Sequence, residues 1–163
     1  MSLDFLSGKC QEPATRATRF GLLDDDSRPE AYTDTANPDK WIATIHNDKA
    51  LELVFTAVDK CLLQNNEYRG RGRCDGMLTS DQHLYFIELK EEASGWIPGA
   101  IEQLESTIQF FLESHDASRY KHKKAFACNR RHRHFQEIDN ELNLRFFRQY
   151  KFRIDVQATV VVL

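Results

Sequence analysis

Residues 73–90 constrain the fold of this chain more than any other stretch. Two short apolar runs, residues 77–78 and 84–89, are rich in residues that favour β-strands. Of the five residues between them, the first four, Thr-Ser-Asp-Gln, are typical of turns. Together these features predict an antiparallel hairpin, because two strand-forming runs with so short a connection pair with each other.

The expected hairpin brings two carboxylates and one ammonium group to the same end. Asp75 lies on its first strand, and Glu88 and Lys90 lie at the end of its second strand. Because side chains alternate along a strand, Glu88 and Lys90 share one face of it. Carboxylate oxygens are the ligands that hard cations such as Mg²⁺ prefer. The pattern therefore indicates a divalent-cation site with a lysine beside it; the simpler alternative is a solvent-facing Glu–Lys pair at a strand end.

Asp75 and the tripeptide Glu88-Leu89-Lys90 resemble the motif of the PD-(D/E)XK nuclease superfamily, although Cys74 stands where that motif usually has proline. The resemblance covers residues 70–130 well, the C-terminal part loosely and the first 40 residues not at all. It implies an α/β fold: a restriction-endonuclease-like mixed sheet with an antiparallel active-site hairpin, flanked by helices.

Phosphodiester hydrolysis needs an activated water and relief of the negative charge that develops on the phosphate. We expect Asp75 and Glu88 to bind Mg²⁺ or Mn²⁺, with the backbone carbonyl of Leu89 as a third ligand. Lys90, an ammonium group beside two carboxylates, is expected to position the water and stabilise charge rather than act as a general base.

A long helix is expected over residues 97–114, with Pro98 in its first turn, where a missing N–H costs nothing. Gln103 lies at the edge of the apolar stripe, from which it can lean over the end of the hairpin. Several branches of the resembled superfamily carry a glutamine on this helix, so Gln103 is the auxiliary site candidate. The stripe itself consists of Ile97, Ala100, Ile101, Leu104, Ile108, Phe111 and Leu112.

The C-terminal part of the chain predicts three further elements. Residues 125–128 are an apolar run typical of an interior strand, and a crossover through the helix places this strand parallel to its predecessor. Residues 152–160 alternate strictly between apolar and polar, which predicts a half-buried strand, with a sheet edge as one position for it. Between them, a second helix is predicted by the spacing of Phe135, Ile138, Leu142 and Phe146.

Residues 41–163 are expected to form one domain, and residues 1–40 an irregular N-terminal extension packed on it, with one short element near Phe20. Residues 41–63 fit both a hairpin and a helix, and their β-branched and aromatic residues favour the hairpin. The resembled family places a supporting glutamate on a helix before the first acid strand. Glu52 fits that role only if the segment is helical, and Asp59 is the fallback.

The net charge is -3, yet the charges are distributed unevenly along the chain. Acidic residues crowd the N-terminal quarter, whereas two basic clusters lie before Asp75 and after the long helix. Such clusters near a cation site favour a polyanionic ligand over plain solvated surface. The residues expected to contact nucleic acid are Arg69, Arg71, Arg73, Lys121, Lys123, Lys124, Arg130 and Arg131.

Other motifs argue against different classes of site. The four cysteines are scattered, which favours reduced thiols in a cytoplasmic protein, and no apolar run has the length of a membrane span. Residues 69–73 lack the lysine of a phosphate-binding loop and are interpreted as a flexible basic approach to nucleic acid. His132 and His134 lack partners at metal-ligand spacing. Cys74 has no paired histidine and is interpreted as a strand residue.

The sequence therefore predicts metal-dependent phosphodiester hydrolysis of nucleic acid, with DNA as the expected substrate. Two alternatives stay open. One is a catalytically inactive member of the same fold that acts as an interaction or immunity protein, and the other is a nuclease subunit that depends on a partner for target choice. A homodimer is also left open.

Overall fold

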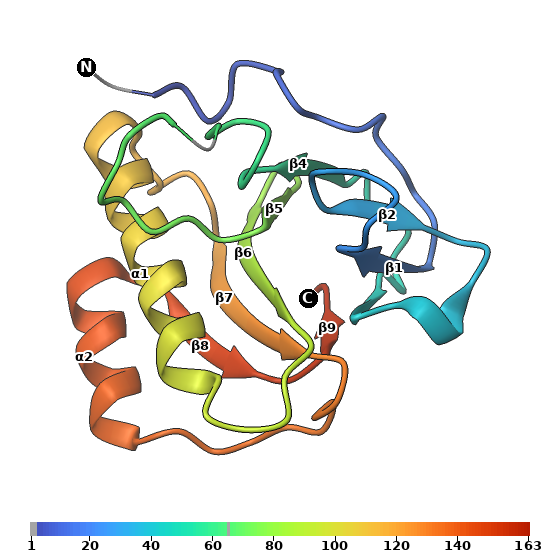
Figure 1. Cartoon of the computed structure of the whole chain (residues 1–163). Coiled ribbons are helices and arrows are strands. Elements are labelled where there is room, and N and C mark those ends of the chain that lie inside the picture. Colours follow the sequence, from blue (N-terminus) through green and yellow to red (C-terminus); the bar gives the residue numbers. More distant parts are fainter. Residues whose placement is uncertain (1–2, 65) are drawn as a thin grey trace.

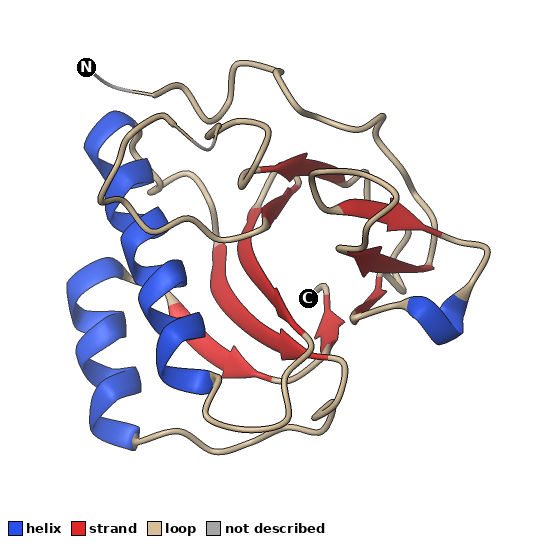
Figure 2. Cartoon of the chain, in the orientation of Figure 1, coloured by secondary structure: helices blue, strands red, loops and turns tan. Residues whose placement is uncertain are grey.

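A computed structural model describes residues 3–64 and 66–163 as two β-sheets and a layer of α-helices (Figures 1 and 2). The five-stranded sheet has the order β4 (Val54–Ala57), β5 (Gly76–Thr79), β6 (His83–Lys90), β7 (His122–Asn129) and β8 (Arg153–Val156). The four-stranded sheet has the order β2 (Tyr32–Asp34), β1 (Arg19–Leu23), β3 (Ala43–His46) and β9 (Thr159–Val161). The helices are the 3₁₀ turn η1 (Pro38–Lys40), α1 (Ile97–Ser114) and α2 (Asn140–Tyr150).

The five-stranded sheet is the middle layer. Figure 2 shows both α-helices on one side of it and the four-stranded sheet on the other. Phe86 of β6 packs in the core under the helices, whereas its neighbours Tyr85 and Ile87 pack in the core between the two sheets. A strand covered on both faces has no solvent side, which explains why β6 reads as a nearly continuous apolar run.

The hairpin and the crossover predicted from the sequence are confirmed. β5 and β6 pair antiparallel with Gly76 opposite Ile87, and the turn closes through a 3.1 Å hydrogen bond from the Ser80 N–H to the His83 carbonyl. α1 then returns the chain to β7, which lies parallel to β6, and β8 is parallel to β7. The α/β class, the mixed sheet and the extent of α1 are as expected.

Residues 41–63 form strands, but not the predicted hairpin. β3 belongs to the four-stranded sheet and β4 to the edge of the five-stranded one. The cause is a turn at Asn47, whose side-chain amide donates to the Leu51 carbonyl at 2.8 Å and whose own carbonyl accepts from the Ala50 N–H at 2.9 Å. This turn carries the chain from one sheet to the other. The helical alternative is wrong as well, and Glu52 is an exposed residue paired with Arg16 at 3.3 Å.

The N-terminal 40 residues are more regular than expected. The predicted element near Phe20 is β1, and β2 was not anticipated. β1 lies between β2 and β3, and its Phe20 and Leu22 are buried between the sheets. Phe5 is fully buried against Phe110 and Phe111 of α1. The segment before β1, residues 3–18, which we call the N-terminal strap, therefore also contributes to the core.

Two C-terminal boundaries differ from the prediction. α2 begins only after Asp139, whose carboxylate accepts from the Glu141 N–H at 3.0 Å, and Phe135 lies before the helix with 59% of its surface exposed. The alternating burial of residues 152–160 is confirmed. The run is nevertheless two strands, because the chain leaves the five-stranded sheet after Val156 and joins the other sheet as β9.

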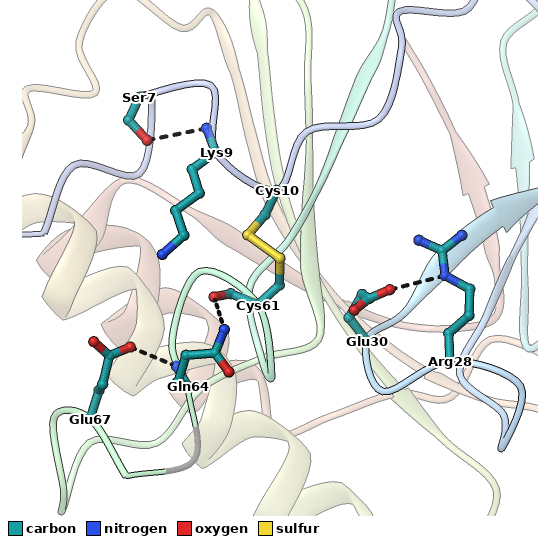
Figure 3. Close-up of a disulfide and its surroundings, with 8 residues drawn as sticks. All are labelled: Ser7, Lys9, Cys10, Arg28, Glu30, Cys61, Gln64 and Glu67. Atoms are coloured by element: carbon teal, nitrogen blue, oxygen red, sulfur yellow. Dashed lines mark hydrogen bonds and ion pairs between the residues drawn. A yellow bond between two sulfur atoms is a disulfide. The ribbon is translucent and has the colours of Figure 1, made fainter.

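The expectation that all cysteines are reduced is wrong for two of them. Cys10 and Cys61 form a disulfide, which joins the N-terminal strap to the segment after β4 (Figure 3). The Ala57 N–H donates to the Cys10 carbonyl at 3.1 Å, so backbone pairing brings the two segments together. Cys74 and Cys128 are buried free thiols. Among the described residues, no helix combines the length and the apolar character needed to cross a bilayer.

A substitution at Gly21 tests whether β1 packs against Trp41 as the structure shows. A Cβ atom at Gly21 would overlap the ring of Trp41, so we expect Gly21→Ala to lower the free energy of unfolding by about 1–3 kcal/mol. Gly99 is a matched control in α1 with open space around it, where alanine should instead add about 0.5–1 kcal/mol. Urea denaturation measures both. A neutral Gly21→Ala variant would show that β1 is not packed as described.

Candidate active site

Asp75 and Glu88 stand opposite each other at one end of the hairpin. Continuing the register of β5 and β6 by one residue beyond Gly76 and Ile87 pairs these two positions. Both side chains are buried, with 9% and 5% of their surfaces exposed. Directly opposed residues of an antiparallel pair have Cβ atoms about 5 Å apart, which suits two ligands of one ion.

Hydrogen bonds from three elements hold Asp75 in place. The Leu89 N–H of β6 donates to Asp75 Oδ2 at 2.7 Å, and the Val58 N–H donates to the Asp75 carbonyl at 2.9 Å. The preceding residue is anchored to α1, where the Cys74 N–H donates to Thr107 Oγ1 at 2.7 Å. The carboxyl group is therefore held by β6, and the backbone that carries it is held by the residue after β4 and by α1.

Gln103 supports the same segment from α1 but two residues earlier than Asp75. Its Oε1 accepts from the Arg73 N–H at 2.7 Å. The backbone approaches the helix closely here, because a Cβ atom at Gly72 would lie 2.7 Å from the same oxygen. Gln103 thus positions the chain that leads to Asp75, and among the described residues it makes no hydrogen bond to either site carboxyl group.

Glu88 has one occupied and one unoccupied oxygen. Its Oε2 lies 3.4 Å from the Lys90 ammonium, which is also 3.8 Å from Glu92 and is partly buried. Its Oε1 is buried without a hydrogen-bond partner among the described residues. A buried polar atom without a partner costs free energy, so this oxygen is suited to accept a ligand.

Burial disfavours the charged form of both carboxyl groups when no cation is bound. It raises the pKa of Asp75 to about 7, although the Leu89 N–H opposes the shift. It also raises the pKa of Glu88 to about 10, with the charge of Asp75 adding to the effect and Lys90 opposing it. At neutral pH the pair therefore retains protons that a bound cation would displace.

The charges of two further acids, Asp59 and Asp24, raise the pKa of Asp75, and only Asp59 is predicted from the sequence as a site candidate. Asp59 was the fallback candidate; its N–H donates to the Cys74 carbonyl at 3.2 Å, and burial raises the pKa of its carboxyl group. Asp24 belongs to the acidic N-terminal quarter, yet it is partly buried, and burial raises the pKa of its carboxyl group. The available signal was its position immediately after the buried apolar run of β1.

The residues fit a hard cation only in part. Across residues 3–64 and 66–163, no three His, Cys, Asp or Glu side chains are arranged as a complete metal-binding group. The carboxyl groups of Asp75 and Glu88, including the unpartnered Oε1 of Glu88, nevertheless provide the oxygen donors that Mg²⁺ prefers. Mg²⁺ commonly keeps several waters when it is bound through one or two carboxylates.

The predicted nucleic-acid residues after α1 are divided between two ends of the sheet. Lys121, Lys123 and Lys124 lie by the hairpin turn, where His83 pairs with His122. Arg130 and Arg131 follow the other end of β7, where the Arg130 N–H donates to the Lys90 carbonyl at 2.9 Å. Positions 83 and 88 are five residues apart on β6, which corresponds to roughly 17 Å of strand. Only the arginines adjoin the candidate site.

Several of these basic residues are occupied by contacts within the chain. Arg71 pairs with Glu113 at 2.7 Å, Arg130 with Glu91 at 3.1 Å, and Lys124 with Asp155 at 2.9 Å. Arg73 donates to the backbone carbonyls of Gln64 and Glu67 at 2.6 and 2.7 Å, so it stabilises the loop before Asp75. Arg69, Lys121 and Arg131 are exposed, and Lys123 is partly so.

The raised pKa values predict how stability depends on pH. The folded protein keeps a proton on Asp75 above its ordinary pKa of 3.8, whereas the unfolded chain releases it, so the free energy of unfolding should fall as pH rises through about 7. We expect this fall in urea denaturation with a chelator present, and a flatter profile for Asp75→Asn. Asp26→Asn, an exposed control, should keep the wild-type profile. A rise in stability over this range would contradict the assignment.

The chain was compared with protein-family models, with curated proteins and with solved structures, and none of them matches it. The function proposed below therefore rests on the placement of Asp75, Glu88 and Lys90 and on the motif that they form.

Proposed function

We propose that this protein is a metal-dependent nuclease of the PD-(D/E)XK kind, which hydrolyses phosphodiester bonds of nucleic acid, with DNA as the expected substrate. The observation that carries the proposal is the buried pair of Asp75 and Glu88 across the hairpin, with an unpartnered Glu88 oxygen and with Lys90 at 3.4 Å. The finer assignment of the fold as restriction-endonuclease-like belongs to the same proposal.

Each residue has a distinct role in this chemistry. Asp75 and Glu88 would hold Mg²⁺ or Mn²⁺, with the Leu89 carbonyl as a further donor, and the bound ion supplies an acidified water and charge relief on the phosphate. Asp75 is oriented for this by the Leu89 N–H. Lys90 contributes a fixed positive charge beside the carboxylates, which lowers the energy of the transition state rather than of the bound substrate.

Asn129 links the segments that follow β6 and β7, beside Lys90. Asn129, which is fully buried opposite Lys90, donates from Nδ2 to the Glu92 carbonyl at 2.8 Å and accepts from the Arg131 N–H at 2.9 Å. One amide thereby ties the segment after β6 to the segment after β7. Exposed Arg131 belongs to the segment that Asn129 anchors, at the same end of the sheet as Lys90, and we expect a phosphate group of a substrate to approach there.

A Lys90 variant distinguishes an active nuclease from an inactive protein that only binds the cation. An ammonium cannot bind Mg²⁺, so Lys90→Ala should leave cation affinity nearly unchanged and lower the rate of cleavage by on the order of a hundredfold or more. Glu88→Gln should abolish both. Plasmid and single-stranded cleavage, measured beside calorimetric Mg²⁺ binding, tests this, with Lys121→Ala as an exposed control. Wild-type cleavage by Lys90→Ala would refute the mechanism.

Arg131 should contribute more to nucleic-acid affinity than the lysines at the other end of β7. Each lost phosphate contact lowers the slope of log K against log salt by about 0.9 for duplex DNA. We therefore expect Arg131→Ala to flatten the slope by about that amount and Lys121→Ala to leave it unchanged. Binding isotherms between low and moderate salt measure the difference. Equal effects of the two variants would show that nucleic acid does not approach over the Lys90 end of the sheet.

A second candidate is a catalytically inactive member of the fold that acts as an interaction or immunity protein. The observation that favours it is the internal engagement of Arg71, Arg73, Lys124 and Arg130, half of the residues expected to contact nucleic acid. Absence of both cation binding and cleavage in the wild-type protein, with an intact fold, would favour this candidate over the nuclease.

A further inference from the structure

We propose that the exposed ring of Phe135 is a stacking surface for a nucleobase, so that the candidate site takes single-stranded nucleic acid. The inference rests on the proposed function, because it names the form of nucleic acid that the site would accept. It concerns a residue outside the Asp…Glu-x-Lys motif and a contact, the stacking of a base on an aromatic ring, that the basic clusters do not supply.

Phe135 differs from the other phenylalanines of the chain. The chain has eleven phenylalanines, all within the described residues, and Phe135 is the only one that is exposed. Nine are buried, and the ring of Phe147 lies 4.3 Å from the Arg153 guanidinium. Phe135 has 59% of its surface exposed, and no aromatic ring or cation of residues 3–64 and 66–163 packs on it. One exposed apolar side chain is ordinary on a protein surface, so its backbone and its neighbours decide its role.

The backbone around Phe135 is anchored on both sides. Two residues earlier, the Arg133 carbonyl accepts from the Ala158 N–H at 3.1 Å. One residue later, the Gln136 N–H donates to the Val156 carbonyl at 2.9 Å. The ring is therefore presented by a backbone that is already ordered, which lowers the entropic cost of placing a base on it.

Phe135 lies along the same end of the five-stranded sheet as the candidate site. Glu88 pairs with Ala127, and Ala127 pairs with Val156. Val156 in turn forms an antiparallel bridge with Gln136, the residue after Phe135. Three steps between neighbouring strands correspond to roughly 14 Å. Figure 1 shows the segments that follow β6 and β7 together at this end of the sheet. At about 3.4 Å per nucleotide of one strand, about four nucleotides cover this distance.

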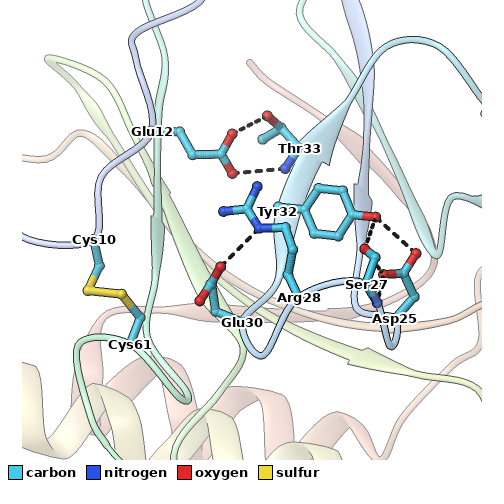
Figure 4. Close-up of polar contacts among 9 residues, drawn as sticks. All are labelled: Cys10, Glu12, Asp25, Ser27, Arg28, Glu30, Tyr32, Thr33 and Cys61. Carbon is cyan, nitrogen blue, oxygen red and sulfur yellow. Dashed lines mark hydrogen bonds and ion pairs between the residues drawn. A yellow bond between two sulfur atoms is a disulfide. The ribbon is translucent and has the colours of Figure 1, made fainter.

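The arginines that precede Phe135 have no acidic partner. Arg131 and Arg133 are exposed, and neither forms an ion pair within the described part of the chain. Arg133 donates to backbone carbonyls, which leave its charge uncompensated. In the loop between β1 and β2, by contrast, Arg28 pairs with Glu30 at 2.9 Å (Figure 4). The positive charge that remains before Phe135 complements the phosphates of a strand whose base lies on the ring.

A hollow of about 330 Å³ adjoins the ring and suits the polar edge of a base. Gln136 and Asn140 bring side-chain amides to its wall, next to Phe135. An amide both donates and accepts hydrogen bonds, so it can bind the edge of a base that is not paired with a second strand. Glu137 and Asp155 also line the hollow and would repel a phosphate, which favours the uncharged base there. These features select an unpaired base over a duplex.

The test is binding of single-stranded and duplex oligonucleotides to the whole protein, in chelator to prevent metal-dependent cleavage and over a range of salt. We expect Phe135→Ala to weaken single-strand binding by roughly 5- to 150-fold and to leave duplex binding nearly unchanged. Because no charge is removed, the slope of log K against log salt should stay the same. Arg131→Ala should instead flatten that slope by about 0.7 for a single strand.

Three variants serve as controls. Phe135→Trp keeps an aromatic face and should bind at least as tightly as the wild type, whereas Phe135→Leu is apolar without such a face and should resemble Phe135→Ala. Leu6→Ala removes an exposed apolar side chain beside His115, at the far end of α1, whose 18 residues span roughly 27 Å. It should bind as the wild type does.

Oligonucleotides with one abasic position, scanned along the strand, isolate the stacking contact. At the position that lies on the ring, loss of the base should weaken binding to the wild type and have little effect on Phe135→Ala, because both changes remove the same contact. Additive losses at every position would show that no base stacks on Phe135, and the inference would be wrong.

The outcomes separate this inference from the proposed function. If Phe135→Ala binds single strands as Leu6→Ala does while the wild type cleaves with Mg²⁺, the nuclease stands and the exposed ring serves another purpose, such as contact with a protein. If Phe135→Ala weakens single-strand and duplex binding equally, the loss reflects a disturbed loop and the inference is wrong. If the wild-type protein binds no nucleic acid at low salt, the proposed function and the inference both fail.

Discussion

Burying Asp75 and Glu88 on adjacent strands costs free energy, and hydrogen bonds from several segments hold Asp75 there. Burial raises the pKa of each carboxyl group, so neither is an easy anion at neutral pH. The position of Asp75 is nevertheless specified by the Leu89 N–H, by the Val58 N–H and, through Cys74, by Thr107 of α1. Apolar residues of similar size at these two positions would often be as stable or more stable, so stability alone does not explain the buried pair.

The two cores on either side of β6 explain how this pair is held so rigidly. β6 has hydrogen-bonded strands on both edges and packed layers on both faces, so its last residues, Glu88 to Lys90, cannot move without disturbing two cores. The disulfide extends the constraint to the N-terminal strap, because Cys61 lies two residues after Asp59. Closing a loop of 51 residues stabilises the folded state by roughly 4 kcal/mol in the chain-entropy account.

The sequence was most informative where local pattern and tertiary environment agree. The hairpin, α1 and the parallel β7 were predictable because turn residues, a helical stripe and the handedness of crossovers each act over short range. The pairing of β3 and β4 was not predictable in the same way. Both segments are strands, but the turn at Asn47 sends them to different sheets, and only the packing of those sheets decides this. The division of residues 152–160 between β8 and β9 has the same cause.

The candidate site shows the same limit. Asp75, Glu88 and Lys90 lie on one hairpin, so their meeting follows from strand alternation and register, and the sequence could predict it. Asp24 lies 51 positions before Asp75, directly after a strand of the other sheet, and the effect of its charge on the pKa of Asp75 depends on how the two sheets pack. Composition even argued against it, since three consecutive aspartates usually form a solvated surface. The three aspartates differ in burial. The first directly follows a buried strand and is partly buried, whereas the next two lie in the loop and are exposed. An acidic run that begins at the end of a buried strand therefore has one member whose environment differs from that of the others.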